Sequence, residues 1–146
     1  MPLDPSPNSA AYIRTEPPHW CMIQVWHSED FYEAVPQLID GATGEPLNLE
    51  TFADLQFNLW IRSEYASVAP TIDLLTTGDD GIYFDDRSQG LISFYRDRGE
   101  VKNYPIGTWV QWLNMLWTEP GGMAVTKTLW RGPLIVRPGS NQELVG

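Results

Sequence analysis

The sequence has little positive charge and almost no cysteine. Nine Lys and Arg residues stand against nineteen Asp and Glu residues, so the formal net charge is -10 at pH 7. A surplus of this sign repels phosphate backbones and anionic lipid surfaces, so neither a nucleic acid nor a membrane is expected as a partner. Because Cys21 is the single cysteine, the chain cannot form an internal disulfide.

Long apolar runs are also missing. No stretch approaches the roughly 18 apolar residues that indicate a membrane-spanning helix, and the start MPLDPSPNSAAYIRTEPP lacks the basic and apolar pattern of a secretory signal. We therefore expect a soluble protein made in the cytoplasm. The length of 146 residues and the hydrophobic content of 42% fit one folded domain.

Histidine is scarce, which limits the possible chemistry. His19, Cys21 and His27 form H-x-C-x5-H, which lacks the second ligand pair of a structural zinc site. His27, Ser28 and Asp30 are close in sequence, but a strand would point neighbouring side chains apart, and no G-x-S-x-G motif is present. Nucleotide-binding glycine motifs are absent too. The sequence therefore predicts no catalytic residues, no cofactor and no metal, and hence no enzyme.

The densest acidic stretch, GDDGIYFDDRSQG, leaves one alternative open. Its aspartates flank a short predicted strand and could meet across a hairpin to bind calcium through oxygen ligands; they are Asp79, Asp80, Asp85 and Asp86. The simpler interpretation is that aspartate next to glycine tolerates turn geometry and solvates the turn. Neither an EF-hand spacing nor a glycosidase cleft is evident.

Proline is concentrated at the beginning of the chain. Residues 1 to 20 combine prolines with small polar residues, which favours extended geometry and offers little to bury. We interpret 1–20 as an extended docking arm, 21–139 as the folded domain and 140–146 as a tail. The residues of the arm that we expect to contact a partner are Pro5, Pro7, Tyr12, Ile13, Pro17, Pro18 and Trp20.

From Cys21 onward the pattern is typical of β-strands. Short segments rich in aromatic and β-branched residues are separated by Gly, Pro, Asp and Asn, at the spacing of a sandwich or barrel. No helical period competes, and hairpins should dominate the connections. The expected strands lie within CMIQVW, FYEAVPQLI, ADLQFNLWIRS, TIDLLTT, GIYFDD, GLISFYRD, GTWVQWLNMLW and AVTKTLWRGPLIVRP.

Alternation assigns faces to two of these strands. In DLQFNLWIR, apolar Leu and Phe residues alternate with a polar face that also carries Trp60. In GTWVQWLNMLW both faces are largely apolar, so this strand is covered on both sides or has its outer face against a partner. Trp60, Trp112 and Trp130, if they face outward, are candidates for partner binding. Their alternative role is a platform of rings that stacks on a glycan.

The order of motifs from residue 38 to 139 resembles the small Ig-like β-sandwich of tailed-phage structural proteins, similar to the N-terminal domain of the baseplate upper protein and to tail or head fibre connector modules. A Gly-Pro-apolar turn leads into a strand ending in arginine, then a glycine hairpin, then a long strand opened by Pro-apolar-Gly-x-aromatic, then a closing strand. The matching residues are Gly44, Pro46, Leu47, Leu49 and Arg62; Gly81, Ile82, Gly90, Leu91 and Ile92; Pro105, Ile106, Gly107 and Trp109; and Leu129, Gly132, Leu134, Val136 and Pro138.

This resemblance implies an all-β, Ig-like antiparallel sandwich that serves as a structural or adaptor subunit of the virion, in the tail, baseplate or fibre-attachment region. Its partners would be other virion proteins and further copies of itself in a symmetric homo-oligomer. Where the family commonly has an aspartate after the aromatic residue of its long strand, this chain has Asn114 and Trp117. The alternative function, reached from the tryptophans, is a carbohydrate-binding module for a cell-surface glycan.

Overall fold

The chain folds almost entirely into β-strands. The structure is a computed structural model, and it describes residues 13–16, 22–65 and 68–139. The strands are β1 (Ile13–Glu16), β2 (Ile23–Trp26), β3 (Phe31–Ala34), β4 (Gln37–Asp40), β5 (Ala53–Arg62), β6 (Thr71–Thr76), β7 (Ile82–Asp86), β8 (Leu91–Arg96), β9 (Gly107–Thr118) and β10 (Ala124–Arg137). Short helical turns connect some of them: η2 (Leu49–Thr51), η3 (Arg87–Gln89) and α1 (Arg98–Val101). The predicted all-β class is confirmed.

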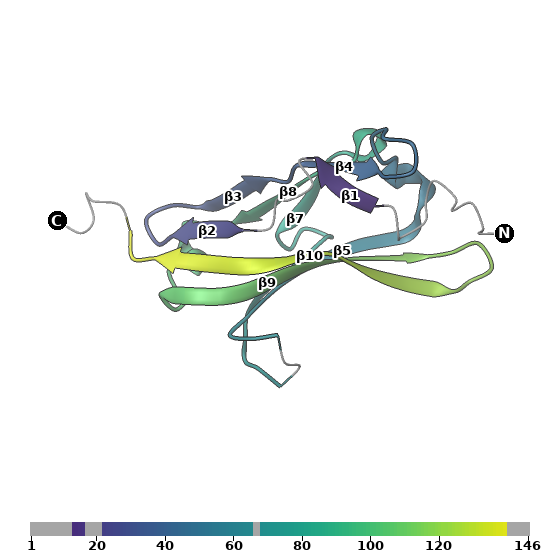
Figure 1. Cartoon of the computed structure of the whole chain (residues 1–146). Coiled ribbons are helices and arrows are strands. Elements are labelled where there is room, and N and C mark those ends of the chain that lie inside the picture. The colour runs from purple at the N-terminus through teal and green to yellow at the C-terminus, as the bar shows by residue number, and fades with distance from the viewer. Residues whose placement is uncertain (1–12, 17–21, 66–67, 140–146) are drawn as a thin grey trace.

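The strands form two layers with the core between them (Figure 1). One layer is a five-stranded sheet in the order β2-β10-β9-β5-β6. The other contains the three-stranded sheet β3-β8-β7 and the two-stranded pair β1-β4. The predicted sandwich is therefore present, and hairpins connect β5 to β6, β7 to β8 and β9 to β10.

Two details differ from a simple antiparallel sandwich. First, β2 runs parallel to β10, with Ile23 opposite Leu134. Second, the expected strand FYEAVPQLI is divided at Val35 and Pro36 into β3 and β4. Proline has no amide proton to donate to a ladder, so the chain leaves the three-stranded sheet there. β4 then pairs with β1 instead.

β1 belongs to the segment that the sequence indicated as an arm. Ile13–Glu16 pair antiparallel with β4, and the side chains of Ile13 and Thr15 are buried. This part of residues 1 to 20 therefore packs on the chain's own domain. The other arm residues expected to contact a partner, Pro5, Pro7, Tyr12, Pro17, Pro18 and Trp20, lie outside the described residues, as does the 140–146 tail.

Glycine is required where η3 meets β8. Gly90 has φ 68°, and a Cβ atom there would lie 2.6 Å from the carbonyl oxygen of Leu38 and 2.9 Å from that of Leu47. Only glycine combines this left-handed backbone with so close an approach of the neighbouring chain. The hairpin predicted from GDDGIYFDDRSQG is therefore anchored against β4.

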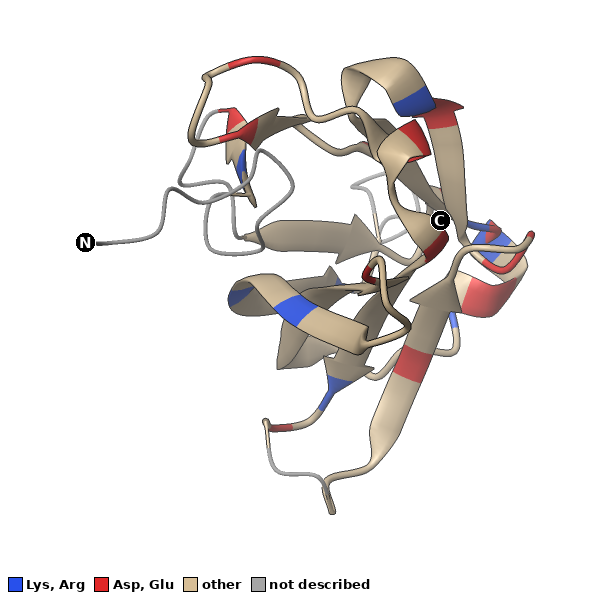
Figure 2. Ribbon diagram, turned by 90° about the vertical axis from the view of Figure 1, so that its right-hand side faces the viewer, with Lys and Arg blue, Asp and Glu red and all other residues tan. Residues whose placement is uncertain are grey.

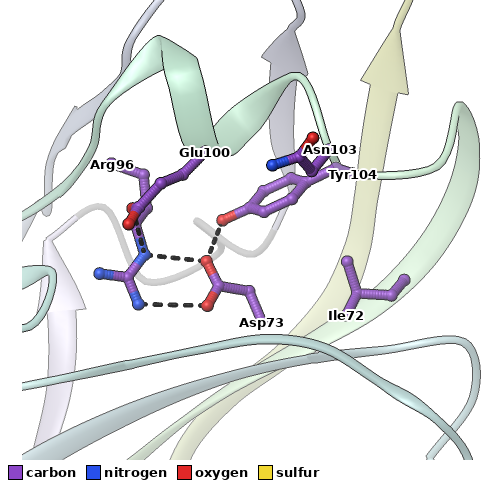
Figure 3. A pocket seen from close by; sticks show the side chains of 6 residues that line it. All are labelled: Ile72, Asp73, Arg96, Glu100, Asn103 and Tyr104. Carbon is purple, nitrogen blue, oxygen red and sulfur yellow. Dashed lines mark hydrogen bonds and ion pairs between the residues drawn. The ribbon is translucent and has the colours of Figure 1, made fainter.

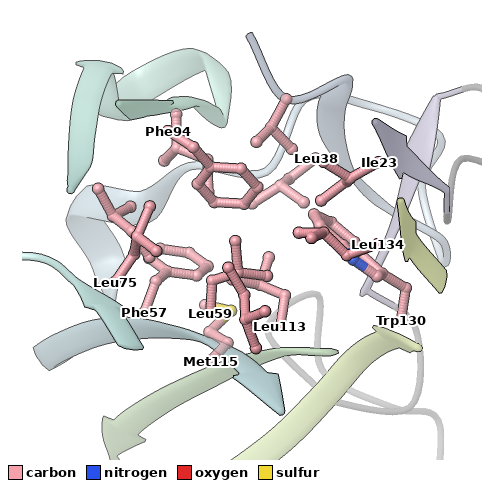
Figure 4. Close-up of a cluster of buried hydrophobic side chains, with 14 of the residues drawn as sticks. Ile23, Leu38, Phe57, Leu59, Leu75, Phe94, Leu113, Met115, Trp130 and Leu134 are labelled. Carbon is pink, nitrogen blue, oxygen red and sulfur yellow. The ribbon is translucent and has the colours of Figure 1, made fainter. Parts of the chain in front are cut away.

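The core lies between the two layers (Figure 4). From the five-stranded sheet it takes Phe57, Leu59, Leu113 and Met115, which are all fully buried. Phe94 of β8 packs against them from the opposite layer (Figure 4). Each such side chain contributes roughly 1.5 to 3 kcal/mol on burial. The alternation predicted for β5 and β9 is confirmed, because these residues occupy alternate positions and point inward.

Trp130 also points into the core. It is 8% exposed, and its Nε1 donates to Oε1 of the buried Gln111 at 2.8 Å. Trp130 shares the inner face with Leu134 by alternation, while a bulge between Thr128 and Trp130 places Thr128 opposite Asn114 on the other face. In the described residues no helix is long and apolar enough to cross a membrane.

Candidate assembly surface

A polar cluster joins the two layers beside a pocket lined by Ile72, Asp73, Arg96, Glu100, Asn103 and Tyr104 (Figure 3). Arg96 of β8 donates from Nε and Nη2 to the two carboxylate oxygens of Asp73 of β6, at 2.9 and 3.1 Å. It also donates to the carbonyl of Leu74 at 3.0 Å and to Asp80 at 2.7 Å. The hydroxyl of Tyr104 donates to Asp73. We call Asp73, Arg96 and Tyr104 the inter-sheet clamp.

The clamp fixes the protonation states of its members. Burial opposes ionisation of Asp73, but the hydrogen bonds from Arg96 and Tyr104 outweigh it and hold the pKa of this carboxyl below its usual range. Burial and the neighbouring Asp73 charge raise the pKa of the Tyr104 hydroxyl. Although burial alone would lower it, the pKa of Arg96 is raised by Asp73 and Asp80. The carboxylate, the guanidinium and the phenol hydrogen-bond to one another and join β6 to β8. The clamp therefore holds the two sheets together.

The aspartates considered for calcium are used separately. Asp80 accepts from Arg96, Asp85 accepts from Ser93 at 3.1 Å, and Asp86 caps η3 by accepting from the amide of Ser88. Over residues 13–16, 22–65 and 68–139 no three His, Cys, Asp or Glu side chains are grouped as metal ligands would be. The structure thus assigns each of these three carboxylates a partner within its own hairpin or the clamp.

The residues considered for zinc or a catalytic triad are likewise apart. His27 Nε2 lies 2.7 Å from the carbonyl oxygen of Tyr104, to which it donates. Asp30 accepts from the backbone amide of Arg98 at 2.8 Å. His19 and Cys21 lie outside the described residues. The hydrogen bonds of His27 and Asp30 therefore fasten the loop after β2 to the segment around α1.

The outer face of the five-stranded sheet carries an aromatic cluster. Trp60 of β5 is the register partner of Trp112 of β9, with ring centroids 6.2 Å apart and planes inclined by 20°. Arg62 places its guanidinium carbon 4.4 Å from the centre of the Trp60 ring. The ring centroid of Tyr65 lies 5.5 Å from that of Trp112, and the guanidinium carbon of Arg131 lies 5.7 Å from the centre of the Tyr65 ring. We call Trp60, Arg62, Tyr65, Trp112 and Arg131 the tryptophan surface.

Local sequence explains why this cluster faces outward. Trp60 alternates with Leu59 and Ile61, which are fully buried, and Trp112 alternates with Gln111 and Leu113. Strand geometry sends every second side chain to the opposite face, so both tryptophans must point away from the core. Their rings are half-buried because they cover each other, because Arg62 lies over Trp60 and because Tyr65 lies against Trp112.

The described candidate residues chosen from the sequence therefore divide into two groups. Trp60 and Trp112 face outward side by side, as required for partner binding. Trp130 and Ile13 are buried in the chain's own core, so their side chains are not on its surface.

Sequence reasoning missed Tyr65 and Arg131. Tyr65 lies in a loop, where no periodicity assigns a face, whereas Trp130 shares the parity of buried Leu134 and Val136, a signal that could have placed it inside.

Comparisons with known proteins add a likeness of fold. No protein-family model matches the chain, and no curated protein matches it in sequence. Among solved structures the chain is similar to the N-terminal domain of phage TP901-1 ORF48, with a TM-score of 0.43 and 12% sequence identity. The match covers 80% of this chain and 84% of that chain.

Proposed function

We propose that the chain is a structural or adaptor subunit of a bacteriophage virion, in the tail, baseplate or fibre-attachment region, and that it performs no catalysis. It assembles with other virion proteins and with copies of itself. The observation that carries this proposal is the tryptophan surface, because two outward tryptophans flanked by arginines are the residue types that dominate protein interfaces.

Two further observations support an assembly role. The motif order from residue 38 to 139 resembles tailed-phage structural proteins, and each of its segments occupies the strand or turn that the resemblance implies. In addition, the polar groups of the clamp hydrogen-bond to one another and join the two layers. Residues 1 to 20 would add a docking segment on either side of β1.

The proposal is tested by the protein content of purified particles. A phage lacking the gene is complemented with the wild-type chain, with Trp60→Ala/Trp112→Ala, or with Met123→Ala as a control. Met123 is 70% exposed in the turn between β9 and β10, away from the tryptophan surface. We expect the wild type and the control in the particles at one fixed copy number, measured by quantitative mass spectrometry, and the double variant folded but excluded. Complete, infectious particles without the chain would refute the proposal.

A glycan-binding module is the second candidate, and one observation favours it. Trp60 and Trp112 present nearly parallel rings, as a sugar-stacking platform does. Against it, Arg62 and Tyr65 already cover parts of these rings. If this candidate is right, soluble cell-surface glycans protect the tryptophan fluorescence of the isolated chain from quenching, and the double variant abolishes this protection.

A further inference from the structure

The outer face of the three-stranded sheet carries a second aromatic group. Tyr32 of β3 is the register partner of Tyr95 of β8, and Tyr83 of β7 is opposite Ser93, two residues along β8 on the same face. These tyrosines are 63%, 38% and 37% exposed, in the order Tyr32, Tyr95 and Tyr83. They lie on the layer opposite the tryptophan surface (Figure 1). Phe94 of β8 points into the core, so its neighbour Tyr95 faces outward. We call Tyr32, Tyr83 and Tyr95 the tyrosine surface.

Carboxylates surround the tyrosine surface. Tyr83 and Tyr95 line a shallow depression whose other residues are Asp79, Asp80, Arg96, Asp97 and Glu100. The cation that lines this depression, Arg96, is already engaged by the clamp. The negative field is felt at Tyr95, whose pKa is raised chiefly by the charge of Asp30. Figure 2 shows acidic residues in this upper layer and its loops, and others on a lower strand and the loop beneath it. The depression therefore favours a cation.

The tryptophan surface has the complementary chemistry. In a chain with more than twice as many acids as bases, its two charged members are Arg62 and Arg131. Arg131 is exposed and stands beside the aromatic ring of Tyr65. A guanidinium can stack on a tyrosine ring while it donates to a carboxylate, which is what a depression walled by Tyr83, Tyr95 and aspartates provides.

We propose that these two surfaces bind each other between copies of the chain, with Arg131 of one copy entering the depression beside Tyr83 and Tyr95 of the next. This inference rests on the proposed assembly function and names its partner and contact. Because the surfaces lie on opposite layers, the contact is heterologous and runs head to tail, and a copy that is bound through one surface keeps its other surface open for a further copy. Such a contact closes into a ring or continues as a stack.

Two charge reversals test the contact. Arg131→Glu reverses a charge on the tryptophan surface. Asp79→Lys reverses a charge in the exposed turn that lines the depression beside the tyrosine surface. Arg14→Glu is the matched control, since Arg14 lies on β1 with an exposed side chain and one ion pair of 3.6 Å to Glu16. Asp79→Asn is a second control, because Asp79 has φ 70° and asparagine keeps that conformation while it removes the charge. Melting temperatures establish that each variant is folded.

Sedimentation equilibrium over a range of concentrations gives the readout. We expect the full-length wild type and Arg14→Glu to self-associate, increasingly at low salt, and each reversal to weaken association by roughly tenfold or more. Asp79→Asn should weaken it less than Asp79→Lys does. A mixture of Arg131→Glu and Asp79→Lys should form one-to-one complexes, since an intact surface of each kind is then available.

The outcomes separate this inference from the proposed function. A wild type that stays monomeric, or reversals without effect, would overturn the head-to-tail contact while leaving virion incorporation intact. Failure of the mixture to associate, although the wild type does, would also overturn it, because it would mean that the two surfaces do not meet. Self-association of a chain that is absent from virions would instead count against the virion role.

Discussion

The two faces of the five-stranded sheet use similar residues for different ends. On the inner face Trp130 donates to Gln111 inside the core, and Asp73 is bound by Arg96. On the outer face Trp60 and Trp112 stack beneath Arg62. The inner groups are enclosed by the second layer, whereas the outer groups lie beside a loop. The same kinds of side chain therefore stabilise the fold on one face and remain available for binding on the other.

The strongest test of this difference compares two tryptophans. Trp130→Ala removes a ring that is 8% exposed and leaves the amide oxygen of Gln111 without its donor. We expect it to lower the free energy of unfolding by about 3 to 5 kcal/mol. Trp112→Ala, on the outer face, should cost about 1 to 2 kcal/mol. Urea unfolding of both variants measures the contrast, and equal losses would show that the outer ring is also part of the core.

Two arginines provide the next contrast. Arg96→Met breaks the clamp and leaves Asp73 partly buried without its main partner, since the two side chains are 11% and 19% exposed. The cost should be about 2 to 3 kcal/mol, less than for a fully enclosed pair. Arg131→Met is its matched control on the outer face and should change stability by less than about 0.5 kcal/mol. A stable Arg96→Met variant would mean that the sheets are held by apolar packing alone.

Acid titration addresses the clamp without removing its arginine. The pKa of Asp73 is lowered in the folded chain relative to its ordinary value of 3.8. The stabilisation from its charge is therefore complete above that value and is lost as the pH falls through the lowered pKa. We expect wild type and Asp73→Asn to differ in unfolding free energy at pH 7, by less than the Arg96→Met effect, and to converge as the pH falls through the lowered pKa of Asp73. A constant difference across this range would contradict the assignment.

Most of the fold follows from local sequence. Alternation placed Leu59 inside and Trp60 outside, and turn residues such as Gly90 marked the hairpins. Pro36 is a strand breaker that can be read from the sequence. The sequence does not indicate, however, that the chain changes sheets there. The parallel pairing of β2 with β10 joins segments more than 100 positions apart, which no local pattern encodes.

The candidate surfaces were harder to predict, because they depend on which residues meet across strands. Trp60 and Trp112 could be assigned to outer faces separately, but their pairing depends on the register between β5 and β9. The inter-sheet clamp joins residues from β6, β8 and the segment after α1. Trp130 was a candidate on condition that it faces outward, but it lies on the inner face with Leu134 and Val136.

Glu33 gives the smallest and sharpest test of how an inward charge is tolerated. Its register partner is the fully buried Phe94, and burial raises the pKa of its carboxyl, with no partner cation contributing to the shift. The effect is opposite to that at Asp73, because the ionised form of Glu33 destabilises the fold. This cost is present above the raised pKa of Glu33 and disappears as the pH falls below the ordinary pKa of 4.5. Because water screens a half-buried side chain, Glu33→Gln should stabilise the chain by at most about 0.5 kcal/mol at pH 7. The gain should vanish near pH 3 in urea unfolding. A loss of stability at pH 7 would show that Glu33, like Asp73, is stabilised in its charged form.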